Sequence, residues 1–401
     1  MKVLVINAGS SSIKYQLIDM TNEALLAKGQ CDRIGIDGGN FKQKSDKGEY
    51  KVEVDIPNHA AGIKLVVDAL TDKEHGVLES MSEIGAVGHR VVHGGEKFSG
   101  SVVITDAVVD AVNECSVLSP LHNPANLTGI KACEEILGKD VPQVGVFDTS
   151  FHQTMPDFAY MYAIPYEYYE KYKLRRYGFH GTSHRYVTAR AAAMLGKKPE
   201  EINIVTCHLG NGSSIAAVKG GKCFDTTMGV TPLEGLMMGT RCGNIDPAII
   251  PFLMEKENLS AKEIDSIMNK KSGILGVTGG VTSDNRDIEE GSRAGNERYQ
   301  LIENMLCHQI TKFVGGYAAA MGGIDAIVFT GGIGENNPKY RAKVAENLGF
   351  MGVEINADAN AKAMRTSDEN DVSACGAKVK MLVIPTNEEL MIARDTYELV
   401  K

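Results

Sequence analysis

The 401-residue sequence contains no tryptophan, only 12 prolines, and no apolar run near the roughly 18 residues that a membrane-spanning helix needs. A basic excess is also missing, because 42 lysines and arginines stand against 51 aspartates and glutamates, a formal net charge of −9. Proteins that hold nucleic acid or an anionic membrane surface through their charge are basic. We therefore expect neither nucleic acid nor a membrane among the partners.

The eight cysteines never show the two-residue spacing of zinc and redox motifs. The apolar stretch at the N-terminus carries a single lysine and is broken at Asn7, too early for the core of a signal peptide. We interpret the cysteines as free thiols in a reducing compartment and expect a cytoplasmic protein.

Glycine, in contrast, is abundant, with 43 residues or about 11% of the chain against a usual 7% or so. Two apolar, β-branched runs, 3–6 and 202–207, each stop at a turn of glycine and small polar residues and then resume as a strand. The two units lie half the chain apart. The sequence thus predicts two related domains that arose by duplication.

A second pair of strands, 144–149 and 326–332, ends in small or acidic turn residues and is expected to correspond between the two halves. Amphipathic patterns between the strands predict helices at 106–118, 124–137, 247–257, 261–269, 297–321 and 388–399. A further helix, capped by Ser183, is expected to end near Leu195. Strands that alternate with helices indicate an α/β protein with mixed sheets.

The stretch 158–177 holds seven of the 14 tyrosines. We interpret it as core or subunit-interface packing, because no basic groove accompanies it as in a base-stacking surface. The domain boundary is expected beside it, near residue 150. One domain would then comprise 1–149 with the last helix, 387–401, and the other 150–386.

Three turns, 7–12, 208–214 and 331–336, combine glycine with small polar residues after a strand. Such a turn exposes several backbone N–H groups to one point, and glycine permits the close approach of a phosphate. One such turn alone is more often a simple hairpin turn, but three in one chain favour a polyphosphate ligand held between two domains. Neither the P-loop pattern nor a dinucleotide-binding glycine pattern is present. Lys14, just after the first turn, either reaches a phosphate or faces solvent.

Two arginines stand in unusual surroundings, Arg90 in an apolar strand-like stretch and Arg241 in a loop between glycines. A buried guanidinium without a partner is costly, so each should meet a carboxylate or a phosphate. An internal carboxylate explains either arginine as well as an anionic substrate does. Their occurrence together with phosphate-type turns favours anion chemistry.

Several other side chains leave two interpretations open. Histidines in loops, such as His122 and His180, are more often structural than catalytic. His180 and His184 are four residues apart, but the glycine and the expected Ser183 cap between them argue against a shared helix face. Asp148 follows a strand and is either a turn cap or a contact to Mg²⁺, water or substrate. Glu388 begins the last helix, where the helix dipole favours acids in any case.

Six stretches of the chain stand out together: 7–14 (NAGSSSIK), 88–95 (GHRVVHGG), 147–149 (FDT), 177–184 (YGFHGTSH), 208–212 (HLGNG) and 329–336 (FTGGIGEN). Several of them are long enough to be specific. With these motifs the whole chain resembles the acetate and butyrate kinase family. The resemblance implies an α/β fold of duplicated ribonuclease-H-like, actin-like ATPase domains with nucleotide in the cleft between them. It also implies a homodimer.

The resemblance further implies roles for residues around the acyl substrate. Arg90 would bind the carboxylate and phosphoryl groups, Asp148 would be the catalytic acid, and His180 and Arg241 would stabilise the transition state. Asn7 and Glu388 would position Mg²⁺ or Mn²⁺. The small pocket for the methyl group would be formed by Val92, Leu121, Phe179 and Pro232.

The nucleotide contacts implied by the resemblance fall into three groups. Lys14 would contact a nucleotide phosphate. The phosphate-binding loop would comprise His208, Leu209, Gly210, Asn211 and Gly212. The adenosine-binding segments would be formed by Asp284, Asn285, Arg286, Gly331, Gly332, Ile333, Gly334, Glu335 and Asn336.

The reaction so implied is ATP + acetate ⇌ ADP + acetyl phosphate by in-line transfer of the γ-phosphoryl group. The attacking carboxylate is already ionised near neutral pH, with a pKa close to the ~4.3 of glutamate, so no base has to deprotonate it. We therefore hypothesise that Asp148 chiefly orients Mg²⁺-bound water or an arginine. A propionate or butyrate kinase would need a larger pocket, and an actin-like or chaperone-like ATPase would not need two anion-binding arginines.

Overall fold

The computed structural model describes residues 1–401 and divides them into two compact units, each described here by itself. Unit 1 comprises Met1–Gln153 with Asn387–Lys401, and unit 2 comprises Thr154–Thr386. The first division follows Gln153, whereas the sequence predicted it after residue 149. No helix has both the length and the apolar composition needed to cross a membrane.

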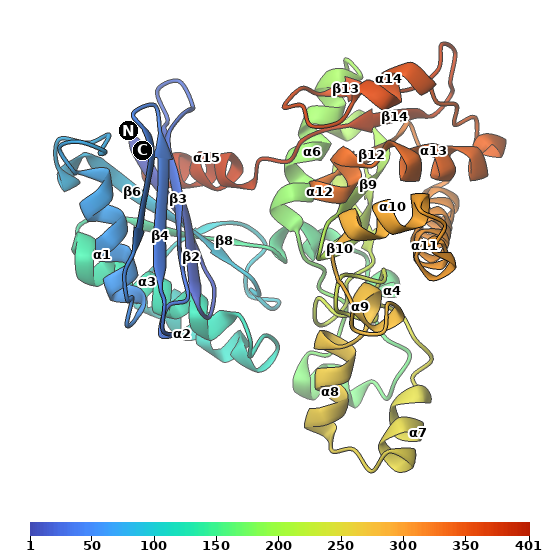
Figure 1. Cartoon of the computed structure of the whole chain (residues 1–401), viewed down its shortest axis with the longest axis horizontal. Coiled ribbons are helices and arrows are strands. Elements are labelled where there is room, and N and C mark those ends of the chain that lie inside the picture. Colours follow the sequence, from blue (N-terminus) through green and yellow to red (C-terminus); the bar gives the residue numbers. More distant parts are fainter. The chain divides into compact units, whose positions relative to one another are not determined.

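Unit 1 is built on one mixed sheet in the order β5-β4-β3-β2-β1-β6-β8-β7. Its strands are β1 (Lys2–Ala8), β2 (Ser12–Asp19), β3 (Ala24–Asp32), β4 (Asn40–Ser45), β5 (Gly48–Glu53), β6 (Ile84–Val91), β7 (Val102–Val103) and β8 (Gln143–Phe147). Strands β1 to β5 form antiparallel pairs, and β6 and β8 extend the sheet parallel to β1 (Figure 1).

Helices cover both faces of this sheet. They are α1 (His59–Leu70), α2 (Asp106–Glu114), α3 (Asn123–Leu137) and α15 (Glu388–Val400). Strand β1 alternates between the two cores: Leu4 and Ile6 pack with the side chains of α1 and α3, whereas Val3 and Val5 pack with Ile392 of α15. The last helix of the chain therefore completes the core of the first unit.

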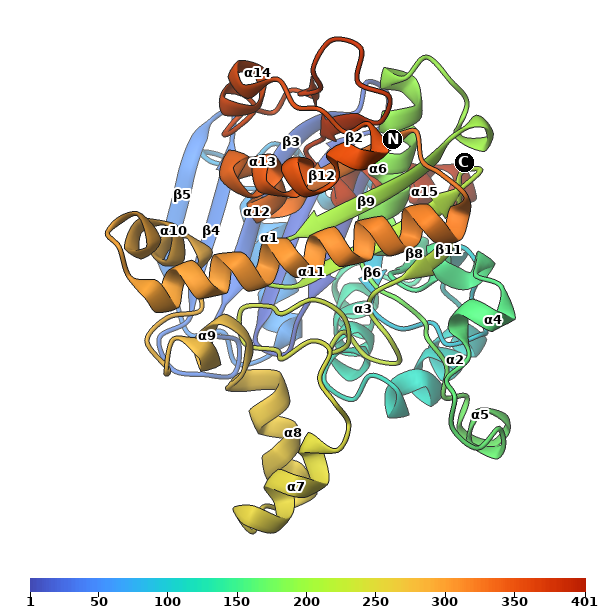
Figure 2. The ribbon, with the colours of Figure 1, turned by 90° about the vertical axis from the view of Figure 1, so that its right-hand side faces the viewer.

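Unit 2 has a second mixed sheet in the order β11-β10-β9-β12-β14-β13. Its strands are β9 (Asn203–Leu209), β10 (Ser213–Lys219), β11 (Lys222–Thr226), β12 (Ala326–Thr330), β13 (Asn370–Asp371) and β14 (Lys380–Val383). Its helices are α4 (Asp157–Tyr160), α5 (Glu167–Tyr172), α6 (Gly181–Met194), α7 (Ile249–Lys256), α8 (Ala261–Lys270), α9 (Gly273–Val277), α10 (Asn285–Arg293), α11 (Glu297–Met321), α12 (Gly331–Asn336), α13 (Pro338–Asn347) and α14 (Ala357–Lys362). The long helix α11 crosses one face of the sheet (Figure 2), and α6 packs against the other through hydrogen bonds to β9 and β10.

The two sheets share one core topology, β3-β2-β1-β6-β8 in unit 1 and β11-β10-β9-β12-β14 in unit 2. In both, an antiparallel three-stranded segment is followed by two strands parallel to the central one. This confirms the duplicated α/β fold expected from the sequence. The predicted second pair of strands is wrong, because β6 corresponds to β12 and β8 corresponds to β14. Buried strands that precede a turn look alike in sequence. Only the order in which the strands pair shows which strands of the two units correspond.

Two local predictions also need correction. Helix α6 begins at Gly181 with His180 at its N-cap, so Ser183 lies in the first turn and does not cap the helix. Residues 331–336, expected as a turn, form the short helix α12. Helix α11 has the predicted bounds, and its N-cap Asn296 accepts hydrogen bonds from Arg298 N and Tyr299 N.

A buried histidine on β6 makes the stability of unit 1 depend on pH. His89 is 2% exposed, and its Nε2 lies 2.6 Å from Gln143 Oε1 on β8. Burial lowers the pKa of His89 to about 4, below the ~6.5 of an exposed histidine. The unfolded chain therefore takes up a proton first as the pH falls, and the free energy of unfolding decreases between about pH 6.5 and 4.

We expect this histidine to contribute a loss of about 2 kcal/mol in the free energy of unfolding between pH 7 and pH 5. His89→Gln keeps an amide donor for Gln143 but cannot take up the proton. Urea unfolding of both proteins at the two pH values measures the contribution. Equal losses in the wild type and the variant would contradict it.

Candidate active site

Arg90 and Asp148, predicted as site residues from separate motifs, form an ion pair in unit 1. Arg90 lies on β6, and Asp148 follows the neighbouring parallel strand β8. Arg90 Nε donates to Asp148 Oδ1 at 2.9 Å and Nη2 donates to Oδ2 at 2.7 Å, a bidentate pair. The Asp148 carboxylate raises the pKa of Arg90 far above its usual value. The pair fixes the guanidinium while 24% of the Arg90 side chain stays exposed.

A cavity of about 300 Å³ in unit 1 brings together four of the predicted residues, Asn7, Lys14, Arg90 and Glu388. Asn7 and Lys14 lie directly opposite each other on β1 and β2. Glu388 Oε1 is buried and has no hydrogen-bond partner. Burial raises the pKa of Glu388 to about 7, with the charge of Arg90 opposing the shift. An orphaned carboxylate oxygen beside an amide in a cavity suits a hard cation.

The four residues expected to surround the methyl group are divided between the units. Val92 and Leu121 belong to unit 1, and Phe179 and Pro232 belong to unit 2. Val92 and Phe179 are buried, at 7% and 1% exposure, whereas Leu121 is 59% exposed. Neither unit by itself encloses the expected pocket.

In unit 2, the expected phosphate-binding loop joins β9 to β10. Ser213 holds its turn, since the hydroxyl accepts from Gly210 N at 3.1 Å and donates to Gly210 O at 2.9 Å. A Cβ atom placed on Gly212 would lie 2.7 Å from Arg241 Nη2 and 3.4 Å from His180 Nε2. The two predicted transition-state residues therefore converge on this loop.

Arg241 is a half-buried guanidinium without an ion pair. Its Nη1 donates to Pro232 O at 2.5 Å. Burial lowers the pKa of Arg241, and no carboxylate opposes the shift. A cation that is partly desolvated and uncompensated favours an anionic ligand.

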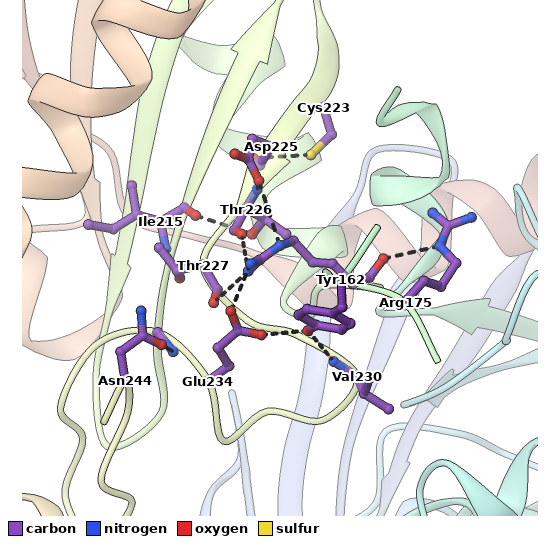
Figure 3. A network of polar contacts seen from close by, with 12 residues as sticks. Tyr162, Arg175, Ile215, Cys223, Asp225, Thr226, Thr227, Val230, Glu234 and Asn244 are labelled. Atoms are coloured by element: carbon purple, nitrogen blue, oxygen red, sulfur yellow. Dashed lines mark hydrogen bonds and ion pairs between the residues drawn. The ribbon is translucent and has the colours of Figure 1, made fainter. Parts of the chain in front are cut away.

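The loop that carries Arg241 is anchored by a polar network (Figure 3). Glu234 accepts from Arg176 Nη2 at 2.7 Å and from Tyr162 OH at 2.5 Å. Tyr162 OH in turn accepts from Val230 N at 3.2 Å, and Asn244 Oδ1 accepts from Gly235 N at 2.7 Å. These hydrogen bonds fix the backbone on both sides of Pro232, whose carbonyl oxygen accepts the hydrogen bond from Arg241.

His180 adopts a left-handed backbone conformation, with φ 55° and ψ 26°. Such a conformation costs a non-glycine residue roughly 1–2 kcal/mol and is frequent at functional sites. Its ring stacks on that of His208 with centroids 4.3 Å apart. Ser183 does not cap α6, and its hydroxyl lies 2.8 Å from both His208 Nδ1 and Thr386 Oγ1.

A carboxylate that the sequence did not single out joins the first expected adenosine-binding segment to Asn337, the residue directly after the second. Glu289 Oε1 accepts from Asn285 Nδ2 at 2.9 Å and from Asn337 Nδ2 at 2.7 Å. Asp284 caps α10 and pairs with Arg286, which is exposed. Glu335 forms a hydrogen bond within its own segment, where its Oε1 accepts from Gly331 N at 2.8 Å.

Gly331 brings α12 to the phosphate loop, because its Cβ would lie 2.7 Å from Leu209 O and its φ is +78°. The segments of unit 2 that the resemblance assigns to nucleotide are thus contiguous. The sequence did not single out Glu289 or Thr206, and it named Ser214 only as the last residue of the turn 208–214.

Comparison with known proteins agrees with this arrangement. A family model described as the Acetokinase family matches residues 2–394. The acetate kinase of Halothermothrix orenii is 56% identical over 402 residues, covering 100% of both chains. The crystal structure of Porphyromonas gingivalis acetate kinase matches with a TM-score of 0.95 and 50% identity, covering 100% of both chains. A propionate kinase from Francisella tularensis matches with a TM-score of 0.92 and 39% identity over 99% of each chain. This chain belongs to the acetokinase family.

Proposed function

We propose that the chain catalyses the reversible transfer of the γ-phosphoryl group of ATP to acetate, giving acetyl phosphate and ADP. The observation that carries the proposal is the uncompensated guanidinium of Arg241, aimed with His180 Nε2 at a loop of phosphate-binding type. Phosphoryl transfer spreads negative charge over the equatorial oxygens in the transition state. A cation and an N–H donor at that point stabilise the transition state more than the ground state.

In this proposal unit 1 receives acetate and unit 2 receives the nucleotide. Arg90 binds the carboxylate of acetate and is held for that task by Asp148. The acceptor is already ionised, so Asp148 need not act as a base. The segments around His208, Asp284 and Gly331 bind ADP and its phosphates, and Lys14 contacts a phosphate from the cavity of unit 1.

The proposed divalent cation is Mg²⁺ or Mn²⁺, held by Asn7 and Glu388. The buried, unpartnered Glu388 Oε1 supports this choice, because Mg²⁺ takes oxygen ligands and is usually held by one or two carboxylates together with phosphates. No group of three acidic, histidine or cysteine side chains would hold a metal by itself. When bound, the cation neutralises charge on the phosphates.

We further propose a homodimer in the cytoplasm. Helix α4, helix α5 and the N-cap residue of α5 expose a set of aromatic side chains of the kind that is enriched at subunit interfaces. They are Phe158, Tyr166, Tyr168 and Tyr172. All eight cysteines are free thiols, which suits a reducing compartment.

The test is ADP release from Mg-ATP with no acid, acetate, propionate or butyrate, with hydroxylamine present to trap acyl phosphate. We expect hydroxamate with acetate and none without acid. Propionate should give less hydroxamate but not zero, because one methylene discriminates between substrates by only about 1–3 kcal/mol. Arg241→Gln should abolish the signal. Arg298→Gln, which removes an exposed arginine of the same unit, is the matched control. ADP release that does not depend on acid and yields no hydroxamate would refute the proposal in favour of a nucleotide-driven ATPase.

A further inference from the structure

Four side chains of unit 2 form a continuous chain of hydrogen bonds that ends at His180. Thr206 Oγ1 on β9 lies 2.7 Å from His184 Nδ1. His184 Nε2 lies 2.8 Å from Ser214 Oγ on β10, and Ser214 Oγ lies 2.8 Å from His180 Nδ1. Thr206, His184 and Ser214 are completely buried. Buried polar groups held at such distances are a fixed part of the structure.

The number of hydrogens makes this chain directional. A hydroxyl carries one hydrogen, and a neutral imidazole carries one N–H and one lone pair. Ser214 Oγ has no acceptor other than the two rings, and a buried hydroxyl hydrogen without a partner is costly, so Ser214 donates to one histidine and accepts from the other. The choice at Thr206 then determines the tautomer of both histidines.

The geometry at Thr206 selects the direction. Its only other hydrogen-bond acceptor, Ala216 O, lies 3.5 Å away, at the limit of a hydrogen bond, whereas His184 Nδ1 lies at 2.7 Å. Thr206 then donates to His184 Nδ1, His184 Nε2–H donates to Ser214, and Ser214 donates to His180 Nδ1. In the neutral ring of His180 the hydrogen is left on Nε2.

Nε2 is also the atom that faces the phosphate loop, 3.4 Å from the Cβ position of Gly212. Arg241 Nη2 approaches the same point, and the ring of His208 stacks on His180. A charged imidazolium at His180 would thus lie beside a guanidinium, and His184 and His208 are titratable groups close to its ring. The proximity of Arg241 favours the neutral ring.

We propose that Thr206, His184 and Ser214 are positioning residues that hold His180 as a neutral imidazole with its hydrogen on Nε2. His180 then donates to the transferring phosphoryl group without first being protonated. This inference rests on the proposed phosphoryl transfer. It assigns no contact with substrate to Thr206, His184 or Ser214.

The kinetic test compares hydroxyl deletions. Ser214→Ala should lower kcat by about 10-fold, because the ring loses its orientation, while KM for ATP changes by less than about twofold. Thr206→Val, which keeps the shape of threonine, should lower kcat less, and Thr206→Ser should restore it. The matched control is Thr188→Val, since Thr188 is a buried hydroxyl on α6 that bonds only His184 O; its kcat should equal that of the wild type.

The pH profile separates positioning from a purely structural role. Wild-type kcat should not decrease as the pH rises through about 6.5, the usual pKa of histidine. In Ser214→Ala, kcat should increase as the pH falls through that value, because protonation places a hydrogen on Nε2 without help from the hydroxyl. A wild-type kcat that falls above pH 6.5, or a Ser214→Ala profile identical to that of the wild type, overturns the inference.

A readout independent of activity is ¹⁵N NMR of histidine-labelled protein without substrate, with His180 assigned through His180→Gln. The expected spectrum has a protonated Nε2 and a bare Nδ1 at neutral pH, changed in Ser214→Ala but not in Thr188→Val. A hydrogen on Nδ1 overturns the inference even in an active enzyme. The expected spectrum from a protein that forms no acyl hydroxamate would instead refute the proposed function.

Discussion

Gly212→Ala is expected to lower kcat/KM for ADP and acetyl phosphate by about 10²-fold or more while leaving the fold intact. The added methyl group would lie 2.7 Å from Arg241 Nη2, closer than two such atoms can approach. The guanidinium is the far end of a flexible side chain, so it moves at little cost to stability. After this movement, the guanidinium no longer faces the position of the transferring phosphoryl group.

The measurements are steady-state kinetics in both directions and thermal unfolding. The unfolding midpoint should stay within a few degrees of that of the wild type, because φ of Gly212 is not in the left-handed region. Gly210→Ala, whose Cβ would meet only Gly212 O at 3.4 Å, should lose less activity. Gly316→Ala, with open space around its Cβ on α11, is the control for a glycine outside the loop. Equal activity of Gly212→Ala and Gly316→Ala would contradict the placement of Arg241.

Asp148→Asn is expected to lower kcat by about 10²- to 10³-fold and to raise KM for acetate. The asparagine has the same shape, but it offers Arg90 one neutral acceptor in place of a bidentate carboxylate. The next strongest attraction on Arg90 is the charge of Glu388, so the guanidinium should turn toward that residue. The carboxylate of acetate would then no longer be bound by a guanidinium held in a fixed position.

The size of this loss should be the same from pH 8 to pH 9, because acetate and Glu388, whose pKa is about 7, are both ionised there. Asp140→Asn, an exposed residue of the same unit, is the matched control. A loss that follows protonation of the nucleophile, and does not respond to Mg²⁺ concentration, would show that Asp148 acts on the acceptor as an acid or base and not on Arg90.

The sequence was most informative where a strand runs directly into a turn. The strand before Asn7 and the strand before His208 were both predicted, because an apolar β-branched run and a glycine turn are local features. The choice between an internal carboxylate and a substrate for Arg90 could not be made locally. Its partner Asp148 is 58 residues away and becomes a neighbour only through the pairing of β6 with β8.

The features that the sequence missed arise from packing between elements. The start of α6 depends on the left-handed conformation of His180. Histidine adopts this conformation more often than most residues, but it is too uncommon to be predicted at a given position. The sequence therefore predicts Ser183 as the cap and argues against a shared helix face for His180 and His184. In the structure both rings bond the same hydroxyl, that of Ser214, which a helix-face argument alone does not reveal.

Helix α15 follows all of unit 2 in the chain, yet Ile392 and Ala393 belong to the core around Val3 and Val5 of the first strand. During synthesis that core would stay exposed until α15 has emerged from the ribosome. The same helix starts with Glu388, the proposed metal ligand. A prematurely terminated chain would therefore have both an open hydrophobic face and an incomplete catalytic centre. Folding of unit 1 and completion of the proposed metal site would both depend on the synthesis of α15.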